Sequence, residues 1–314
     1  MKVAILDDYQ GVALQLADWS PVADRAEITV FTDHLADPDD VVARLAPFDV
    51  VFVMRERTPL PREVLERLPR LRMIASNGKV NAAIDMAAAQ QQGIEVSGSG
   101  GTAAGTVEMT WALILSAARA LPTENASLRS GGWQTGVGTE LAGRTLGVLG
   151  LGRIGSRVAR VGAAFGMDVI AWSQNLTPAA AEAAGARWVD RDTLLDTADV
   201  LSIHLRLSDR TRGLIGADAL ARMKPTALLI NTSRGPIVDE AALVSALRAD
   251  RLGGAGLDVF DTEPLPAQHP LRSLDNVVAT PHIGYVTDRQ YRRFFADAVA
   301  AISDWLDRNS GAAR

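Results

Sequence analysis

The chain has 314 residues, of which 47% are hydrophobic and 22% charged, and this is the balance of a globular protein of about two domains. Its 32 basic and 37 acidic residues give a formal net charge of −5 without a long run of either sign, which argues against binding to nucleic acid or an anionic membrane. The absence of cysteine excludes disulfides, thiolate metal sites and cysteine nucleophiles. The first eight residues reach two aspartates before an apolar run long enough for a signal peptide, and no run of about 18 apolar residues occurs. We therefore expect a cytoplasmic α/β protein.

The first hundred residues alternate short apolar runs with helical patterns. Each run is rich in β-branched side chains and bounded by Asp, Pro, Gly or Asn, as is typical of buried parallel strands. Strict alternation with crossover helices predicts a parallel sheet that is covered on both faces. The predicted strands are residues 3–6, 28–31, 50–54, 73–75 and 94–96, with helices at residues 61–68 and 84–92.

A glycine-rich segment at residues 98–105 interrupts this alternation and precedes a long apolar helix at residues 106–120. We interpret the segment as a flexible joint, because a phosphate-binding P-loop would also need a Lys-Ser or Lys-Thr pair. A polar stretch at residues 127–139 follows the helix.

From residue 145 a second alternation predicts about six strands, the number that a dinucleotide-binding sheet uses. A last helical pattern at residues 288–308 is expected to return to the first lobe. We therefore predict two doubly wound α/β lobes, residues 1–98 with 288–314 and residues 99–287. The six strands are residues 146–149, 168–172, 200–205, 227–231, 256–260 and 277–279.

The run Gly-Leu-Gly-Arg-Ile-Gly at residues 150–155 directly follows a predicted strand and opens a helical stretch at residues 156–165. In this context the first glycine allows a tight turn, the second lets the backbone approach a pyrophosphate, and the third allows the helix to pack closely on the sheet. The helix N-terminus would then offer free N–H groups to the phosphates. A tight turn that binds no ligand is the alternative. The residues predicted to hold the pyrophosphate are Gly150, Gly152, Arg153, Ile154 and Gly155.

The position that selects between NAD and NADP lies at the end of the next strand, about 20 residues further on. There the chain has Ser173 and Gln174, with neither an acid to bind the ribose diol nor a basic residue to bind a 2′-phosphate. Both side chains can bond neutral hydroxyls and neither repels a phosphate. The predicted cofactor is therefore NAD or NADP, with the choice open.

The four histidines differ in their predicted surroundings. His34 lies among aspartates after a strand and is interpreted as a solvated loop residue, and His269 precedes a proline and is interpreted as part of a surface turn. His204 and His282 follow strands, on the edge where open α/β sheets bind ligands. We expect His204 to line the cofactor site and His282 to transfer a proton, although His282 could also be a satisfied polar cap.

Three motifs end predicted strands of the second lobe, and a parallel sheet would bring them to one edge. They are Asn231-Thr-Ser-Arg-Gly-Pro, Leu257-Asp-Val-Phe-Asp-Thr-Glu-Pro and Thr280-Pro-His-Ile-Gly. With the glycine fingerprint, Asn77-Gly-Lys-Val-Asn and Val107-Glu, they resemble the D-isomer-specific 2-hydroxyacid dehydrogenases over essentially the whole chain. The resemblance implies a flavodoxin-like substrate lobe and a Rossmann dinucleotide-binding lobe. It also implies hydride transfer between a nicotinamide cofactor and a small 2-keto or D-2-hydroxy acid of the glyoxylate or hydroxypyruvate kind.

The resemblance assigns roles that the chemistry of the residues supports. Arg234 offers paired planar donors that can clamp the carboxylate and carbonyl of a 2-keto acid. His282 would donate the proton on reduction, and Glu263 would hold the imidazole in orientation. The substrate would be bound by Asn77, Gly78, Lys79, Val80 and Arg234, with backbone N–H groups around Gly78 holding its carboxylate. The cofactor would also contact His204, Leu205, Arg206, Thr232, Asp258 and Gly284, and no metal is expected.

Three residues depart from the family pattern. Arg206 stands where the family usually has proline, and it either favours a 2′-phosphate or points to solvent. Lys79 in the substrate loop either attracts a second anionic group or is solvated. Tyr285 adds an aromatic ring beside the His282 motif that would trim substrate size.

Other functions remain open at this stage. Formate dehydrogenases pair their histidine with glutamine, so Glu263 argues against them. A dinucleotide-sensing corepressor-like protein and a 3-phosphoglycerate-type dehydrogenase are the remaining alternatives. The family usually forms homodimers through the dinucleotide lobe, for which the helix from Thr106 and the segment Gly131-Gly132-Trp133 are candidates, although core packing explains them equally well.

Overall fold

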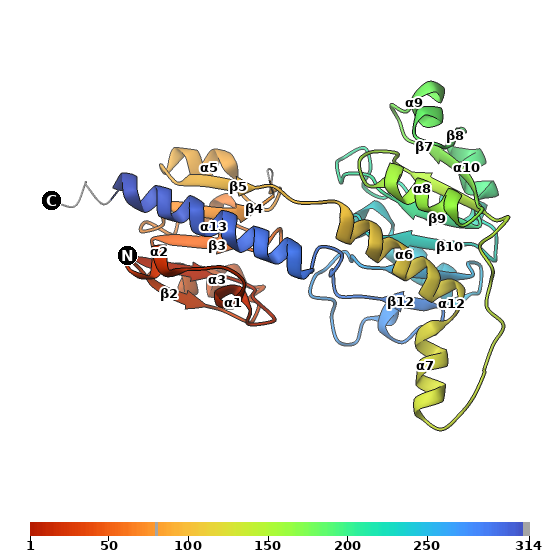
Figure 1. The fold of residues 1–314 in the computed structure, drawn as a ribbon, viewed down its shortest axis with the longest axis horizontal. Helices are drawn as coiled ribbons and strands as arrows, with labels where there is room; N and C mark the ends of the chain where they lie inside the picture. The colour runs from red at the N-terminus through yellow and green to blue at the C-terminus, as the bar shows by residue number, and fades with distance from the viewer. Residues whose placement is uncertain (79–80, 310–314) are drawn as a thin grey trace. The chain divides into compact units, whose positions relative to one another are not determined.

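The computed structural model describes residues 1–78 and 81–309, and the chain divides into two compact units (Figure 1). The first unit comprises Met1–Thr102 and the segment from Val286 onward, and the second comprises Ala103–Tyr285. Each unit has its own parallel sheet.

The sheet of the first unit has five strands in the order β2-β1-β3-β4-β5, all parallel among the described residues. This is the flavodoxin-like order, in which the direction of winding reverses between β1 and β3. The strands are β1 (Lys2–Ile5), β2 (Glu27–Val30), β3 (Val50–Val53), β4 (Met73–Asn77) and β5 (Glu95–Ser99).

Helices cover both faces of this sheet because each carries one apolar stripe. The helices α3 (Pro38–Leu45), α4 (Arg62–Leu65) and α5 (Met86–Gln91) share a core with β1, β3 and β4. The long helix α13 (Asp288–Asn309) packs on β4 and β5 and contacts the short helices α1 (Ala13–Leu16) and α2 (Ser20–Ala23). Its Phe295 is fully buried, and the ring centroid lies 5.5 Å from that of Phe52 on β3. The last helix therefore completes the first unit.

The sheet of the second unit has seven parallel strands in the order β12-β11-β10-β9-β6-β7-β8. This is a Rossmann order, with winding that reverses between β6 and β9. The strands are β6 (Thr145–Leu149), β7 (Asp168–Trp172), β8 (Arg187–Trp188), β9 (Val200–Ile203), β10 (Leu228–Asn231), β11 (Gly254–Leu257) and β12 (Val277–Ala279).

Two apolar cores lie on the two faces of this second sheet. One contains side chains of α6 (Ala104–Ala118) and α8 (Gly155–Ala164), and the other contains side chains of α10 (Arg191–Thr197), α11 (Ala217–Arg222) and α12 (Glu240–Arg248). The apolar sequence of α6 is therefore explained by core packing, with Leu113 and Ile114 fully buried. The remaining elements are α7 (Leu121–Arg129), α9 (Pro178–Ala183), α10 (Arg191–Thr197), α11 (Ala217–Arg222), η1 (Gly235–Ile237), α12 (Glu240–Arg248) and η2 (Pro270–Arg272).

The predicted fold class, two doubly wound parallel α/β lobes, is confirmed, but some elements differ from their prediction. The edge strand β8 was not predicted, because it has only two residues and both are exposed. Helix α7 overlaps the polar stretch and was not predicted. It buries no side chain, so its sequence carries no apolar stripe that would signal a helix. The glycine-rich joint is shorter than predicted, since Gly98 pairs with Ser76 within the sheet and β5 runs on to Ser99.

Candidate active site

The carboxyl ends of the parallel strands in the second unit meet at one edge of the sheet, and the strand order fixes the sequence of residues along it. Moving from β12 toward β7, the residues that follow the strands are Thr280, Asp258, Thr232, His204, Gly150 and Ser173. Open α/β sheets bind ligands outside this edge, at the point where the winding reverses. The fingerprint therefore lies at the reversal, and the predicted proton-transfer residues lie toward the β12 end.

The turn after β6 has the conformation that a dinucleotide needs. Gly150 has φ +102°, and a Cβ there would lie 2.8 Å from the carbonyl oxygen of His204. A Cβ on Gly155 would lie 2.1 Å from the carbonyl oxygen of Gly150, so the start of α8 packs directly on the turn. A Cβ on Gly152 would meet nothing within 4 Å, which leaves open space beside the backbone. This space at the N-terminus of a ten-residue helix, with Arg153 and Ile154 in the same turn, fits a bound pyrophosphate.

His204 follows β9 and lines the other side of the reversal point. Its Nε2 lies 2.8 Å from the Ser202 hydroxyl, and its Nδ1 is buried without a hydrogen-bond partner among the described residues. Burial lowers the pKa of His204 from 6.5 to about 4, so the ring is neutral at pH 7. A neutral buried nitrogen that lacks a partner is the kind of group that a bound ligand can satisfy.

Four further predicted cofactor residues lie on the same edge. Ser173 directly follows β7, and Gln174 beside it is exposed. Leu205 packs against the core, and Arg206 is exposed, with its carbonyl accepting the Thr211 hydroxyl at 2.7 Å. Neither Ser173 nor Gln174 can repel a 2′-phosphate, so the geometry leaves both cofactors possible.

Arg234 lies in a turn that the buried Asn231 shapes. The Asn231 side-chain amide donates to the carbonyl of Arg234 at 2.9 Å, and its oxygen accepts the N–H of Ser233 at 3.0 Å. Thr232 in the same turn is anchored through its hydroxyl, 2.9 Å from that of Thr110 on α6. Two elements therefore hold the segment that carries the guanidinium.

His282 and Glu263 form the pair that the sequence predicts. Nδ1 of His282 lies 2.5 Å from Oε2 of Glu263, and the other carboxylate oxygen accepts the N–H of Phe260 at 2.9 Å. His282 has φ +52°, a left-handed conformation that is uncommon outside glycine and tends to occur at functional sites. The backbone and the carboxylate thus fix the ring, and Nε2 remains as the nitrogen that can exchange a proton with a ligand.

Asp258 has a more local role than the sequence suggests. Its Oδ1 accepts the Thr280 hydroxyl at 2.6 Å and the N–H of Ile283 at 2.8 Å, and its Oδ2 accepts the N–H of Gly284 at 2.8 Å. Burial raises the pKa of Asp258, against the lowering effect of these hydrogen bonds and of His282. Asp258 therefore holds the turn that carries His282, which the prediction of a cofactor contact did not include.

Gly235 joins the Arg234 turn to the segment before Glu263. A Cβ on Gly235 would lie 2.0 Å from the carbonyl carbon of Phe260 and 2.6 Å from the nitrogen of Asp261. The two backbones therefore touch, one residue from Arg234 and three from Glu263. This close approach explains why glycine follows Arg234, and it was missed because nothing local in the sequence signals it.

The predicted substrate loop follows β4 in the first unit. The buried side chain of Asn77 accepts the N–H of Arg55 at 2.5 Å, and the N–H of Gly78 donates to the carbonyl of Ser99 at 3.0 Å. The N–H of Gly78 is thus bonded within the sheet in this structure, and its predicted role toward the substrate carboxylate stays a prediction. Lys79 and Val80 lie outside the described residues, and their predicted roles stay predictions.

The two remaining histidines both have carboxylate partners. Nδ1 of His34 lies 3.0 Å from the buried carboxylate of Asp7, so the interpretation of His34 as a solvated loop residue is wrong. Nε2 of His269 lies 3.1 Å from Glu240. Among the residues that the structure describes, no cluster of His, Asp and Glu could hold a metal ion, and none of the helices is long and apolar enough to cross a membrane.

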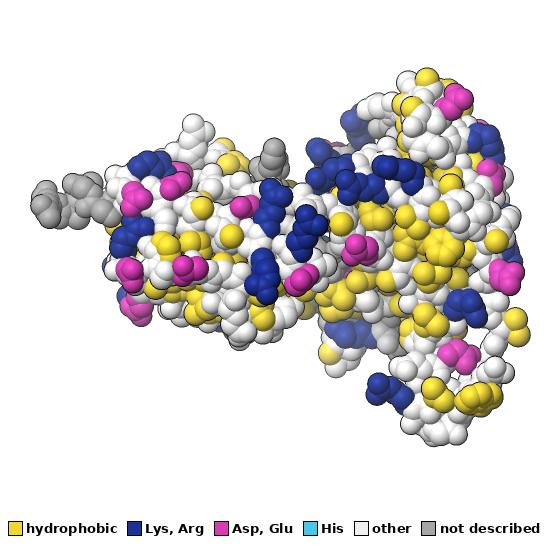
Figure 2. All heavy atoms as spheres, in the orientation of Figure 1, with side chains coloured by type: hydrophobic (Ala, Val, Ile, Leu, Met, Phe, Trp, Pro, Cys, Tyr) yellow, Lys and Arg dark blue, Asp and Glu magenta, His cyan; other side chains and the backbone are white. Residues whose placement is uncertain are grey.

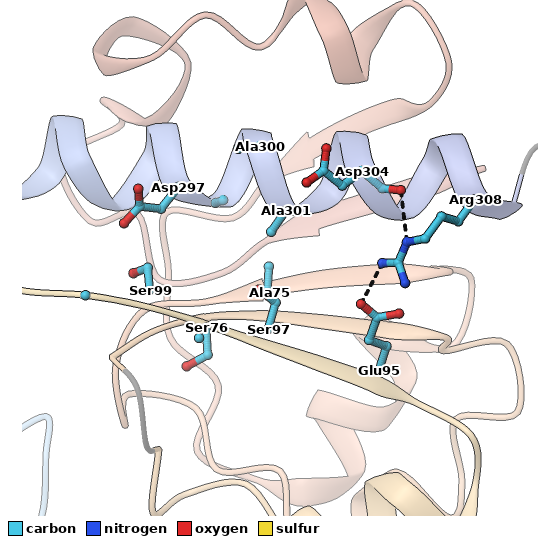
Figure 3. A pocket seen from close by; sticks show the side chains of 13 residues that line it. Ala75, Ser76, Glu95, Ser97, Ser99, Asp297, Ala300, Ala301, Asp304 and Arg308 are labelled. Atoms are coloured by element: carbon cyan, nitrogen blue, oxygen red, sulfur yellow. Dashed lines mark hydrogen bonds and ion pairs between the residues drawn. The ribbon is translucent and has the colours of Figure 1, made fainter.

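A cavity of about 400 Å³ lies in the first unit between α13 and the strands β4 and β5 (Figure 3). It exists because the facing positions carry small side chains, among them Ala75, Ala298 and Ala301, and one end carries an ion pair of Arg308 with Glu95 at 2.7 Å. None of the predicted site residues lines it.

Comparison with known proteins places this geometry in a family. The family described as D-isomer specific 2-hydroxyacid dehydrogenase, NAD binding domain, matches residues 111–284. A glyoxylate reductase from Aeropyrum pernix is 45% identical over 235 residues, covering 72% of this chain and 70% of that protein. A hydroxypyruvate reductase from Blautia hydrogenotrophica is 31% identical over 317 residues, covering 98% and 97%. A crystal structure of a phosphoglycerate oxidoreductase from Vibrio cholerae gives a TM-score of 0.93 at 38% identity, covering 98% and 99% of the two chains.

A Rossmann sheet with a glycine turn before a helix, and a His–Glu pair at the same edge, define a dehydrogenase that uses a nicotinamide dinucleotide. The chain belongs to the D-isomer-specific 2-hydroxyacid dehydrogenases and is an NAD(P)-dependent oxidoreductase of 2-hydroxy acids, as the resemblance implies. The matched D-3-phosphoglycerate dehydrogenases are longer, and the chain covers 46% to 51% of their length. These relatives bear the names of enzymes, and nothing in them supports the corepressor alternative.

Proposed function

We propose that the protein reduces a small 2-keto acid of the glyoxylate or hydroxypyruvate class to its D-2-hydroxy acid. The observation that carries this proposal is the contact of 2.5 Å between His282 Nδ1 and Glu263 Oε2. Glu263 holds Nδ1 of the imidazole, which leaves Nε2 to give a proton to the oxygen that forms when hydride reaches the keto carbon. The names of the glyoxylate and hydroxypyruvate reductases among its relatives support this substrate class.

Each residue has a separate task in the proposed reaction. Bound NAD(P)H supplies the hydride, and residues 150–155 with His204 would hold its phosphates and ribose. Arg234 would bind the carboxylate and carbonyl oxygens of the substrate through paired N–H donors. His282 would protonate the carbonyl oxygen from Nε2 on reduction and accept a proton there on oxidation. The substrate lobe would be the first unit, and the cofactor lobe would be the second.

A substrate panel tests the proposal. Purified protein is mixed with glyoxylate, hydroxypyruvate or 3-phosphohydroxypyruvate and with NADH or NADPH, and the oxidation of the reduced cofactor is followed. Turnover of glyoxylate or hydroxypyruvate is expected, whereas turnover of 3-phosphohydroxypyruvate alone would instead support the phosphoglycerate class that several relatives' names suggest. Higher kcat/KM with one of the two reduced cofactors would identify the physiological one.

The role of His282 has its own test. H282A is expected to lower turnover by about 10²–10⁴-fold, the usual range for a lost general acid, while cofactor binding persists. Unchanged turnover would remove His282 from the mechanism.

We also propose that the protein is a homodimer in the cytoplasm. Support for a dimer comes from α7 and the segment after it, in which Trp133 is 72% exposed and Val137 fully exposed. Hydrophobic side chains lie on the surface in this region (Figure 2). A cytoplasmic location agrees with the use of nicotinamide dinucleotides, which are metabolites of the cell interior.

A further inference from the structure

Glu240 is the first residue of α12, and the proposed reaction gives it no task. Both of its carboxylate oxygens contact one loop, residues 261–269. Oε2 accepts the N–H of Asp261 at 3.1 Å, and Oε1 lies 3.1 Å from Nε2 of His269. A single side chain on a packed helix therefore connects the beginning and the end of this loop.

His269 contacts Glu240 through one ring nitrogen and the turn after the loop through the other. Nδ1 of His269 accepts the N–H of Leu271 at 3.3 Å, and Nε2 lies 3.1 Å from Oε1 of Glu240. The imidazole and the carboxylate are each only 19% exposed. This contact between the loop and α12 is therefore mostly shielded from solvent.

The braced loop carries Glu263, the partner of His282. One oxygen of Glu263 accepts the N–H of Phe260, and the next N–H along the chain, that of Asp261, goes to Glu240. The two neighbouring N–H groups thus bond two different carboxylates, one that contacts His282 and one on α12. A shift of this backbone relative to α12 would move the Glu263 carboxylate away from the imidazole.

The same stretch of backbone is confined from a second side. Gly235 packs against Phe260 and Asp261, and the middle of the loop is held by Arg272, which donates to the carbonyl oxygens of Pro266 and Leu265 at 2.9 Å and 2.6 Å. Glu240 is the contact that ties this internally braced loop to a helix of the core.

We propose that Glu240 is a positioning residue for proton transfer. It fixes the loop of residues 261–269 on α12, so that Glu263 meets His282 in the orientation that the reaction needs. The inference rests on the proposed roles of Glu263 and His282, and it adds to them a residue that touches neither substrate nor cofactor.

The variants E240A and E240Q test this proposal in the full-length protein. E240A removes both contacts, and we expect kcat for keto-acid reduction to fall by about 10- to 100-fold, the scale of a misplaced catalytic group, with KM for both substrates nearly unchanged. E240Q keeps one acceptor for the N–H of Asp261 and should lie between E240A and the unaltered protein.

D192A is the matched control. Asp192 also lies in the first turn of a helix of the second unit, α10. Its carboxylate lies 3.4 Å from the guanidinium of Arg222, which is not part of the loop. Both changes remove a helix-terminal acid and its contact with a basic side chain, so both are expected to lower Tm slightly, whereas only E240A should lower kcat. Equal kcat values for E240A and D192A would overturn the proposal.

A double-mutant cycle shows whether Glu240 acts through Glu263. In an E263Q background, E240A should change kcat by less than about 2-fold, because residues that act as one unit are not additive. A full additional loss in that background would overturn the proposal, and if E240A does not fold, E240Q serves in the same cycle. Unaltered turnover in H282A would instead remove His282 from the mechanism, and a lack of turnover in the substrate panel would remove the proposed function, both independently of the result for Glu240.

Discussion

His204 has one buried ring nitrogen without a partner in the described part of the chain, and this has a consequence for stability. Its pKa falls from 6.5 in the unfolded chain to about 4 in the folded protein. Between these two values the unfolded chain binds a proton and the folded protein does not, so the free energy of unfolding decreases as pH falls. Well above pH 6.5 both states are neutral and the effect vanishes.

The variant H204Q removes this titration and should make the free energy of unfolding less dependent on pH. We expect its free energy of unfolding, measured by urea denaturation at several pH values between 4 and 7, to depend less on pH by up to about 1.4 kcal/mol per pH unit. Parallel curves for H204Q and the unaltered protein would show that His204 is protonated equally in both states.

At Gly235 a single methyl group should disturb the site. The added carbon of G235A would lie 2.0 Å from the Phe260 carbonyl carbon, so either the Arg234 turn or the Glu263 segment must move. We expect kcat/KM for the keto acid to fall by about 100-fold or more. G216A is the control, because a carbon there meets only the Gly213 carbonyl, at 3.5 Å, and steady-state kinetics near the unaltered value in both variants would contradict this account.

At the scale of elements, α7 and the segment after it are held together by hydrogen bonds, although α7 buries no side chain. Oε1 of Glu124 accepts the Thr135 hydroxyl at 2.6 Å and the N–H of Gly136 at 3.0 Å, and Ser127 donates to the carbonyl of Trp133 at 2.8 Å. The hydroxyl and N–H of Thr135 lower the pKa of Glu124, so its carboxylate stays charged at neutral pH. A segment held in one conformation loses less entropy when it docks on a partner.

The double variant W133S/V137S should therefore convert a dimer into a monomer. Sedimentation velocity measures the change, and dinucleotide binding should persist because the glycine turn is untouched. W188S is the control, since Trp188 is also exposed in the second unit but lies on the edge strand β8. Dissociation by W188S and not by the double variant would place the interface elsewhere.

The elements differ in how well the sequence predicts them. Strands such as β3 and β9 are buried along their length, so their apolar runs identify them. β11 begins two residues earlier than predicted, at Gly254, because glycine and alanine carry no strand preference and only pairing with the neighbouring strands β10 and β12 defines them. The positions of Arg234, Glu263 and His282 follow from motifs, but the contacts of Glu240 and Gly235 join distant segments and leave no local pattern.

At the scale of the whole molecule, the two units have separate apolar cores. Side chains of β1, β3 and β4 form a core in the first unit, and two further cores lie on the faces of the second sheet. Separate cores can unfold separately, and only the second unit contains the glycine turn. We therefore expect two transitions in calorimetry.

Saturating NAD(P)H should shift only one of these transitions. At a cofactor concentration of about 100 times Kd, binding raises the free energy of unfolding of the second unit by about 2.7 kcal/mol. For a domain of this size that raises Tm by about 5–10 °C. A single transition, or an equal shift of two, would mean that the units unfold together.

The long helix α13 joins the first unit only after the chain has passed through the entire second unit. It brings Phe294, Phe295 and Trp305, all buried, to the first sheet. During synthesis β1 to β5 therefore leave the ribosome with one apolar face of their sheet exposed. The second unit is completed before α13, which covers that face, has been translated. The nascent chain can then assemble its nucleotide-binding half first, and the earliest part of the polypeptide is the last to finish folding and the most dependent on chaperones in the interval.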